Sequence, residues 1–185
     1  MNGIFIGGSR SVTRLDAEIL ARLDRIIEQR LPVLVGDADG VDKAVQEYLR
    51  TKGYPAVEVF CSGGRCRNNV GGWPVRAVRS TGTRRDFAFY AAKDRQMAEE
   101  ATRGLMLWDG RSKGTLMNVL RLVRQGKDVV VYSAPAGRFM ELRSEPDLND
   151  FLARCPGDLR QQVEKEPRFE ARQQNLAGRT RLLAD

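Results

Sequence analysis

The chain has 185 residues, of which 31 are basic and 24 are acidic, so its formal charge is +7. Charged residues make up 30% of the chain and hydrophobic residues 42%, which is typical of a water-soluble globular protein and excludes a membrane protein, a collagen or a disordered tail. This length suits one domain of ordinary size with an appendage.

The chain contains no histidine. This excludes histidine-based acid/base catalysis, histidine-containing triads and nearly all catalytic zinc sites. Any chemistry must therefore use carboxylates, Lys, Arg, Ser, Thr, Tyr or Cys.

The three cysteines are Cys61, Cys66 and Cys155. Four residues separate the first two and no second pair follows, so we predict free thiols and no metal site. The N-terminus lacks the basic start and long apolar run of a signal peptide. The sequence therefore predicts a reducing, cytoplasmic location without a membrane anchor.

The positive charge is concentrated in one segment. Between residues 61 and 86, six arginines oppose one aspartate, and between 154 and 185 seven basic residues oppose five acidic ones. A local anion site explains this pattern, and a solvated arginine-rich loop is the alternative.

Apolar strands and amphipathic helices alternate along the first half of the chain. Strands are predicted at residues 4–6, 33–35 and 57–60, and helices at 15–27 and 41–49. The stretch 62–83 is rich in Gly, Asn, Pro and Thr, which predicts a long loop with a short strand near Val75.

The alternation continues with a predicted helix at 85–101, a strand at 105–108, a helical face at 116–123 and a strand at 129–132. Uniformly apolar strands between helices predict an α/β fold with a mostly parallel sheet and helices on both faces, a three-layer sandwich. We expect one domain at 1–134 with a basic loop insertion at 61–86. Residues 135–185 would form an appendage with an edge strand or turn near 139–142, short helices and a partly flexible tail.

Ligands of an open parallel sheet bind beyond the carboxyl ends of its strands. The first loop there, Gly7 to Arg10, offers exposed backbone N–H groups, a hydroxyl and a guanidinium to an anion. A tight turn would need only one of its two glycines, so the composition favours phosphate binding.

The second loop, Gly36 to Asp42, places three carboxylates at a helix start. Helix capping explains part of this pattern, but three carboxylates exceed what capping needs and would suit ribose hydroxyls, an amine or a metal ion. The third loop, Asp109 to Thr115, brings two cations, a hydroxyl and small residues to the next helix, without the spacing of a P-loop. Together the loops predict a pocket for a phosphorylated ribose.

These loops, in this order and with the helical sequence Lys93 to Met97, resemble the YspA-like proteins. That family belongs to a Rossmann-like superfamily that includes the DNA-processing protein DprA and the LOG-type cytokinin-activating phosphoribohydrolases. The resemblance covers about the first three quarters of the chain and implies a Rossmann-like, nucleotide-binding domain. It leaves the arginine-rich insertion and the tail unexplained.

The LOG enzymes hydrolyse an N-glycosidic bond and carry a Pro-Gly-Gly-x-Gly-Thr-x-x-Glu motif with an Arg on the preceding helix. Here Gly114 and Thr115 match, but Asn118 stands where the Glu would be and Lys93 lies near the Arg position. An amide cannot replace a carboxylate as general base or stabilise an oxocarbenium-like transition state. The departure counts against hydrolysis unless another carboxylate substitutes.

Three functions follow: nucleotide-ligand binding or sensing first, N-glycoside hydrolysis second, and single-stranded nucleic-acid binding through the segment Arg65 to Arg85 third. The expected partners are a nucleotide-derived small molecule and a second copy of the chain in a homo-oligomer, with no cofactor. The predicted ligand-binding residues are Gly7, Gly8, Ser9, Arg10, Gly36, Asp37, Asp39, Asp42, Lys93, Arg95, Asp109, Gly110, Lys113, Gly114 and Thr115.

Overall fold

The computed structural model describes residues 3–63, 65–78 and 87–165. Its strands are β1 (Gly3–Gly8), β2 (Val33–Gly36), β3 (Val57–Ser62), β4 (Val75–Val78), β5 (Ala101–Trp108), β6 (Asp128–Ser133) and β7 (Arg138–Leu142). Its helices are α1 (Ala17–Glu28), α2 (Val41–Thr51), α3 (Phe87–Glu100), α4 (Lys113–Arg124) and α5 (Glu145–Ala153), and residues 157–165 are also helical.

The strands form one sheet in the order β4-β3-β2-β1-β5-β6-β7. All neighbouring strands are parallel except β7, which runs antiparallel to β6. The chain builds outward from β1 to β4 and then returns to the other side of β1 with β5. The carboxyl ends of β1 and β5 therefore flank the point where the strand order reverses, which is where open α/β sheets bind ligands.

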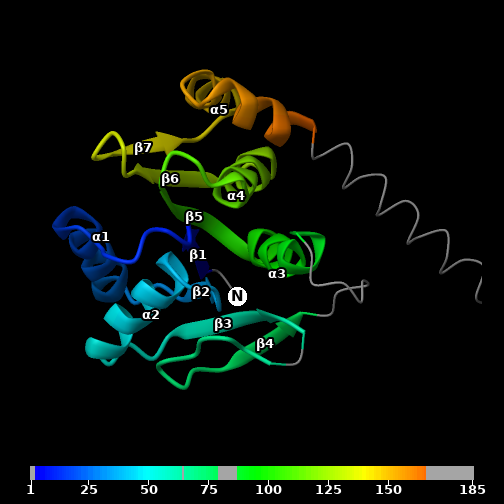
Figure 1. The fold of residues 1–185 in the computed structure, drawn as a ribbon. Coiled ribbons are helices and arrows are strands. Elements are labelled where there is room, and N and C mark those ends of the chain that lie inside the picture. The colour runs from blue at the N-terminus through cyan, green and yellow to red at the C-terminus, as the bar shows by residue number, and fades with distance from the viewer. Residues whose placement is uncertain (1–2, 64, 79–86, 166–185) are drawn as a thin grey trace, which may run out of the picture.

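Helices cover both faces of the sheet, and Figure 1 shows α1 and α2 on one face and α3, α4 and α5 on the other. The side chains of β1 alternate between these layers: Ile4 and Ile6 pack with α1 and α2, whereas Phe5 packs with α3 and α4. Strands buried on both faces must be apolar at every position, and this is the pattern in the sequence. The predicted three-layer α/β fold is confirmed.

The boundary between α3 and β5 was predicted wrongly. The helix expected to run to Ala101 ends at Glu100, and β5 begins at Ala101 instead of Leu105. Thr102 and Arg103 are exposed, so this stretch lacks the apolar pattern of a buried strand, yet Arg103 lies opposite Ile4 in the ladder with β1. Backbone pairing here prevails over side-chain character.

The C-terminal part of the described chain joins the same sheet and core. The segment near 139–142 is a strand, β7. In α5, Leu148, Phe151 and Leu152 are buried in the same hydrophobic cluster as the apolar side chains of α4. Residues 166–185, the predicted tail, lie outside the described residues, and the boundary at 134 stays a prediction.

No helix within the described ranges is long and apolar enough to cross a membrane. The cytoplasmic location and the homo-oligomer stay predictions.

Substitutions at Gly8 and Gly114 test the packing of β1 against β5. A Cβ on Gly8 would overlap the carbonyl oxygen of Leu107 and the side chain of Val41, whereas a Cβ on Gly114 would meet nothing within 4 Å. We expect Gly8→Ala to lower the free energy of unfolding by at least about 2 kcal/mol, since backbone must move to relieve the overlap. Gly114→Ala, the matched control within α4, should raise it by roughly 0.5–1 kcal/mol because alanine restricts the unfolded chain.

Urea denaturation of both variants measures these changes. Equal effects of the two substitutions would contradict the described packing of β1 against β5.

Candidate functional site

A cleft of about 600 Å³ opens at the carboxyl ends of β1 and β5. The end of β1, the start of α2, the inner side of α3 and the first turn of α4 enclose it. Of the predicted site residues, those that line it are Gly7, Gly8, Arg10, Asp42, Lys93, Asp109, Gly114 and Thr115. The structure therefore brings the three predicted loops together around one cavity.

The other predicted residues lie outside this lining. Ser9 is fully buried beneath the cleft. Asp37 and Asp39 line a neighbouring cavity of about 460 Å³, and Gly110 lines a third cavity of about 380 Å³ near Pro135. Gly36, Arg95 and Lys113 are not among the residues that line these cavities.

The hydroxyl groups of the cleft brace its loops. Ser9 Oγ lies 3.3 Å from Thr115 Oγ1 and accepts the backbone N–H of Asp109 at 3.1 Å. Ser112 caps α4, since its Oγ accepts from Thr115 N at 3.3 Å and from Thr115 Oγ1 at 2.9 Å. These bonds tie the end of β1 to the start of α4, and they fix where the N–H groups of the first turn point.

Asp109 organises the rim of the cleft. Its carboxylate accepts the hydroxyl of Ser11 at 2.6 Å and the backbone N–H groups of Arg111 and Ser112 at 2.9 and 2.8 Å. Burial acts to raise the pKa of Asp109, but these hydrogen bonds outweigh it and hold the pKa below its ordinary value. The residue therefore stays a carboxylate at neutral pH and shapes the loop.

A polar chain runs through the wall of the cleft. The ammonium of Lys93, 4% exposed, lies 3.7 Å from Asp42 Oδ2 and 2.8 Å from Asp94 Oδ1. Asp94 accepts from Asn118 Nδ2 at 3.3 Å, and Asn118 Oδ1 accepts from Arg121 at 2.7 Å. The amide of Asn118 thus links Asp94 of α3 to Arg121 of α4.

Gly36 makes room for this chain. A Cβ at Gly36 would overlap both the carboxylate of Asp42 and the ammonium of Lys93. The pair therefore packs directly on the backbone at the end of β2, and Gly36 has a structural role.

Asp42 titrates unusually high. Its burial raises its pKa to about 6, against the opposing attraction of Lys93 and with added repulsion from Asp94 and Asp37. Lys93 remains charged, because the effect of its burial is outweighed by Asp94 and Asp42, which raise its pKa. Asp42 is thus a carboxyl group whose proton occupancy changes just below neutral pH.

The second loop is closed by the segment 66–70, which follows β3. Arg67 binds the buried carboxylate of Asp37 in a bidentate pair, with Nη2–Oδ1 at 2.6 Å and Nε–Oδ2 at 3.1 Å, and its backbone N–H donates to the same Oδ2 at 3.1 Å. Asn68 Nδ2 donates to Asp37 O and to Asp39 Oδ1. Burial acts to raise the pKa of Asp37, but Arg67 and Lys93 hold it below its ordinary value.

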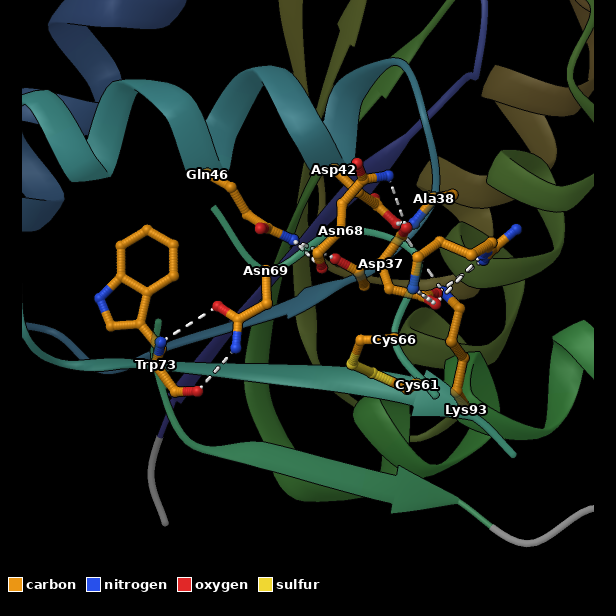
Figure 2. Close-up of a disulfide and its surroundings, with 12 residues drawn as sticks. Asp37, Ala38, Asp42, Gln46, Cys61, Cys66, Asn68, Asn69, Trp73 and Lys93 are labelled. Carbon is orange, nitrogen blue, oxygen red and sulfur yellow. Dashed lines mark hydrogen bonds and ion pairs between the residues drawn. A yellow bond between two sulfur atoms is a disulfide. The ribbon is translucent and has the colours of Figure 1, made fainter. Parts of the chain in front are cut away.

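The cysteine prediction was wrong for Cys61 and Cys66, which form a disulfide with their Cα atoms 5.2 Å apart. Figure 2 shows it beside Asp37, at the base of the segment that carries Asn68 and Asn69. Their sulfur atoms lie within 4.8 Å of an Asp37 carboxylate oxygen. The sequence spacing gave no sign of this pairing, because Cys61 lies at the end of β3 and only the turn after it brings Cys66 back. Cys155 is a buried free thiol.

Sequence reasoning missed several residues of the cleft. Tyr90 was not among the predicted site residues, but it lines the cleft, and the guanidinium groups of Arg10 and Arg67 lie over its ring at 5.5 and 4.8 Å. Asp94 and Arg121 also line the cavity. For Asp94 a signal existed, because it lies next to Lys93 in the helical sequence that carried the family resemblance.

The basic segment is partly neutralised. Arg67 pairs with Asp37, and Arg76 pairs with Glu58 and Glu100 at 3.0 and 3.3 Å. Three further arginines of this segment, Arg79, Arg84 and Arg85, lie outside the described residues.

No protein-family model and no curated protein matches the chain. Among solved structures, the fold is similar to the X-ray structure of DNA processing protein A (DprA) from Streptococcus pneumoniae, with a TM-score of 0.56 and 17% sequence identity. The similarity covers 84% of this chain and 62% of that DprA chain, so the chain spans less than two thirds of the length of DprA. At this identity, the similarity shows a shared fold.

The raised pKa of Asp42 predicts a distinct pH dependence of stability. Its folded-state pKa, about 6, exceeds its ordinary value of 3.8, so the carboxyl adds stability below pH 4 that is lost as the pH rises through 6. Relative to Asp42→Asn, the wild-type chain should lose up to about 3 kcal/mol of unfolding free energy between pH 4 and 7. Urea denaturation of both proteins across this range measures the difference, and a difference independent of pH would contradict it.

Proposed function

We propose that the cleft binds a nucleotide or a nucleotide-derived molecule, with phosphate at the loop after β1 and the first turn of α4. The observation that carries this proposal is the meeting of two features at the reversal of strand order. One is a glycine loop beside a helix N-terminus, and the other is a set of cations next to buried carboxylates.

The phosphate would lie where the cleft is open and positive. Gly114 faces open space in the first turn of α4, so a ligand can approach its backbone closely. The N-terminus of α4 carries partial positive charge, and Arg10 and Arg121 add guanidinium groups at the same cavity. These groups favour an anion with several oxygen acceptors.

The ribose would lie toward the second loop. Asp42 lines the cleft at the start of α2, and its carboxylate can accept hydrogen bonds from vicinal hydroxyls. Asp37 and Asp39 line the neighbouring cavity, and Asp37 is bound by Arg67, so Asp42 is the carboxylate of this loop that we assign to the sugar. Tyr90 offers an aromatic face for a base.

Hydrolysis of an N-glycosidic bond is the second candidate, favoured by one observation. Asp42 has a pKa of about 6, which suits a group that exchanges a proton near neutral pH. In this mechanism Asp42 would act as general base or stabilise the oxocarbenium-like transition state, which the amide of Asn118 cannot do. If so, bound nucleotide should release free base, and Asp42→Asn should abolish release while binding persists.

Binding of single-stranded nucleic acid is the third candidate. DprA, whose fold is similar, is a DNA processing protein. The described arginines Arg67 and Arg76 of the basic segment are engaged in ion pairs, which reduces the charge that they offer to a phosphate backbone. This function predicts binding to oligonucleotides that weakens steeply with salt.

Calorimetric titration with AMP, ADP-ribose, NAD and cyclic nucleotides tests the proposal. Arg10→Ala should weaken binding by about tenfold or more, since a charge-assisted hydrogen bond contributes roughly 1.5–3 kcal/mol. Arg14→Ala is the matched control, because Arg14 is exposed in the same loop and does not line the cleft.

Each titrated sample is then checked for released base by chromatography. Intact ligand supports binding alone, whereas free base supports hydrolysis. Binding to none of the nucleotides, or equal losses in both arginine variants, would overturn the proposal.

A further inference from the structure

The Cys61–Cys66 disulfide is joined directly to the charged residue that links two cavities. Arg67 follows Cys66 in sequence and lines both the nucleotide cleft and the neighbouring cavity of about 460 Å³. Cys61 is buried at the end of β3, whereas Cys66 is half-buried and lines the smaller cavity. An exogenous thiol therefore has a route to Cys66.

The disulfide fixes the start of the segment 66–70. Beyond Cys66 this segment is held by hydrogen bonds: Arg67 and Asn68 bind the second loop, and Val70 N donates to Gln46 at 3.1 Å. The covalent tie to β3 is the anchor nearest to the Asp37–Arg67 pair, because one peptide bond separates Cys66 from Arg67. Breaking the tie leaves the hydrogen bonds alone to keep Arg67 in place.

The position of Arg67 changes the charge of the cleft. Among the described residues, four cations (Arg10, Arg67, Lys93 and Arg121) and three carboxylates (Asp42, Asp94 and Asp109) line it. Withdrawal of Arg67 leaves equal numbers of each and also uncovers the carboxylate of Asp37. An anionic ligand would then meet a less positive cavity.

We propose that Cys61 and Cys66 form a reversible redox-modification site that holds Arg67 on Asp37 and thereby sets the affinity of the cleft for anionic ligands. A dithiol reductant attacks Cys66 Sγ as a thiolate, and Cys61 leaves and takes up a proton. The second thiol of the reductant then releases Cys66, so that one disulfide becomes two thiols and the reductant becomes a cyclic disulfide. In the opposite direction, glutathione disulfide oxidises the two thiols, the Cys61–Cys66 bond forms again, and two molecules of glutathione are released.

The proposal gives the cysteine pair two forms, a disulfide and a dithiol. In a reducing compartment, disulfides are rare and those that form are usually transient and redox-sensing. The cytoplasmic location expected from the sequence would therefore place the pair in its dithiol form at rest. Oxidation would then form the Cys61–Cys66 disulfide and hold Arg67 on Asp37.

Closure of the Asp37–Arg67 pair can be measured without any ligand. The backbone N–H of Arg67 donates to Asp37, so hydrogen exchange of this single amide reports whether the pair is closed. We expect exchange to be at least about tenfold faster in dithiothreitol than in glutathione disulfide. Mass analysis after alkylation verifies the thiol state, with Cys155 as an internal reference because burial raises its pKa to about 11.

The consequence for the cleft is measured with ADP-ribose, and this part rests on the proposed function. We expect affinity to be about tenfold higher in the oxidised protein. The double substitution Cys61→Ser and Cys66→Ser should give the lower affinity in both buffers. Cys155→Ser, the matched control, should keep the full redox response.

The outcomes separate the two proposals. Unchanged exchange of the Arg67 amide between verified oxidised and reduced wild-type protein overturns the redox site, as does altered exchange with unchanged affinity for ADP-ribose. If ADP-ribose binds in neither state, control of affinity fails together with the proposed function for this ligand. The amide exchange still decides whether the disulfide holds Arg67 in place.

Discussion

The buried ammonium of Lys93 is the interaction on which the candidate site depends. A charge this deeply buried must stay paired, and its partners come from different helices. Asp42 lies in the first turn of α2, Asp94 follows Lys93 in α3, and Asn118 connects Asp94 to α4. One cation thus sets the spacing of three helices around β1 and gives the cleft its shape, while Gly36 leaves the space that the pair requires.

This arrangement divides the polar groups of the site by role. Ser9, Ser112 and Thr115 use their hydroxyls on each other, and Asp37 and Asp94 are held by Arg67 and Lys93. The cavity is also lined by backbone at glycines, by guanidinium groups, by an aromatic ring and by the carboxyl of Asp42, which lies 3.7 Å from Lys93. Such a set is suited to holding an anionic ligand, which is why we place binding ahead of turnover.

Much of this was predictable because it follows from local pattern. Apolar strands between amphipathic helices predict a parallel sheet, and a parallel sheet gathers its strand ends at one edge, so the meeting of the loops at Gly7, Asp42 and Thr115 could be anticipated. The direction of a side chain within a loop could not be anticipated from the sequence. Ser9 points into the protein, where its Oγ lies 3.3 Å from the Oγ1 of Thr115, more than a hundred residues later.

The same limit explains the residues that sequence reasoning missed. Arg67 looked like one of many surface cations, and only the turn after β3 places it on Asp37, thirty residues earlier. That turn also brings Cys66 to Cys61. Tyr90 belongs to a helix of mixed composition, in which no periodicity distinguishes a cavity wall from a packed face.

Backbone amide chemical shifts, recorded by NMR as ADP-ribose is added, test the central claim most directly. The account predicts the largest changes at Gly7, Gly8 and Gly114, with a further change at the side-chain amide of Asn118. Changes confined to amides remote from these loops, or no change at millimolar ligand, would contradict the assignment of the cleft as a nucleotide site.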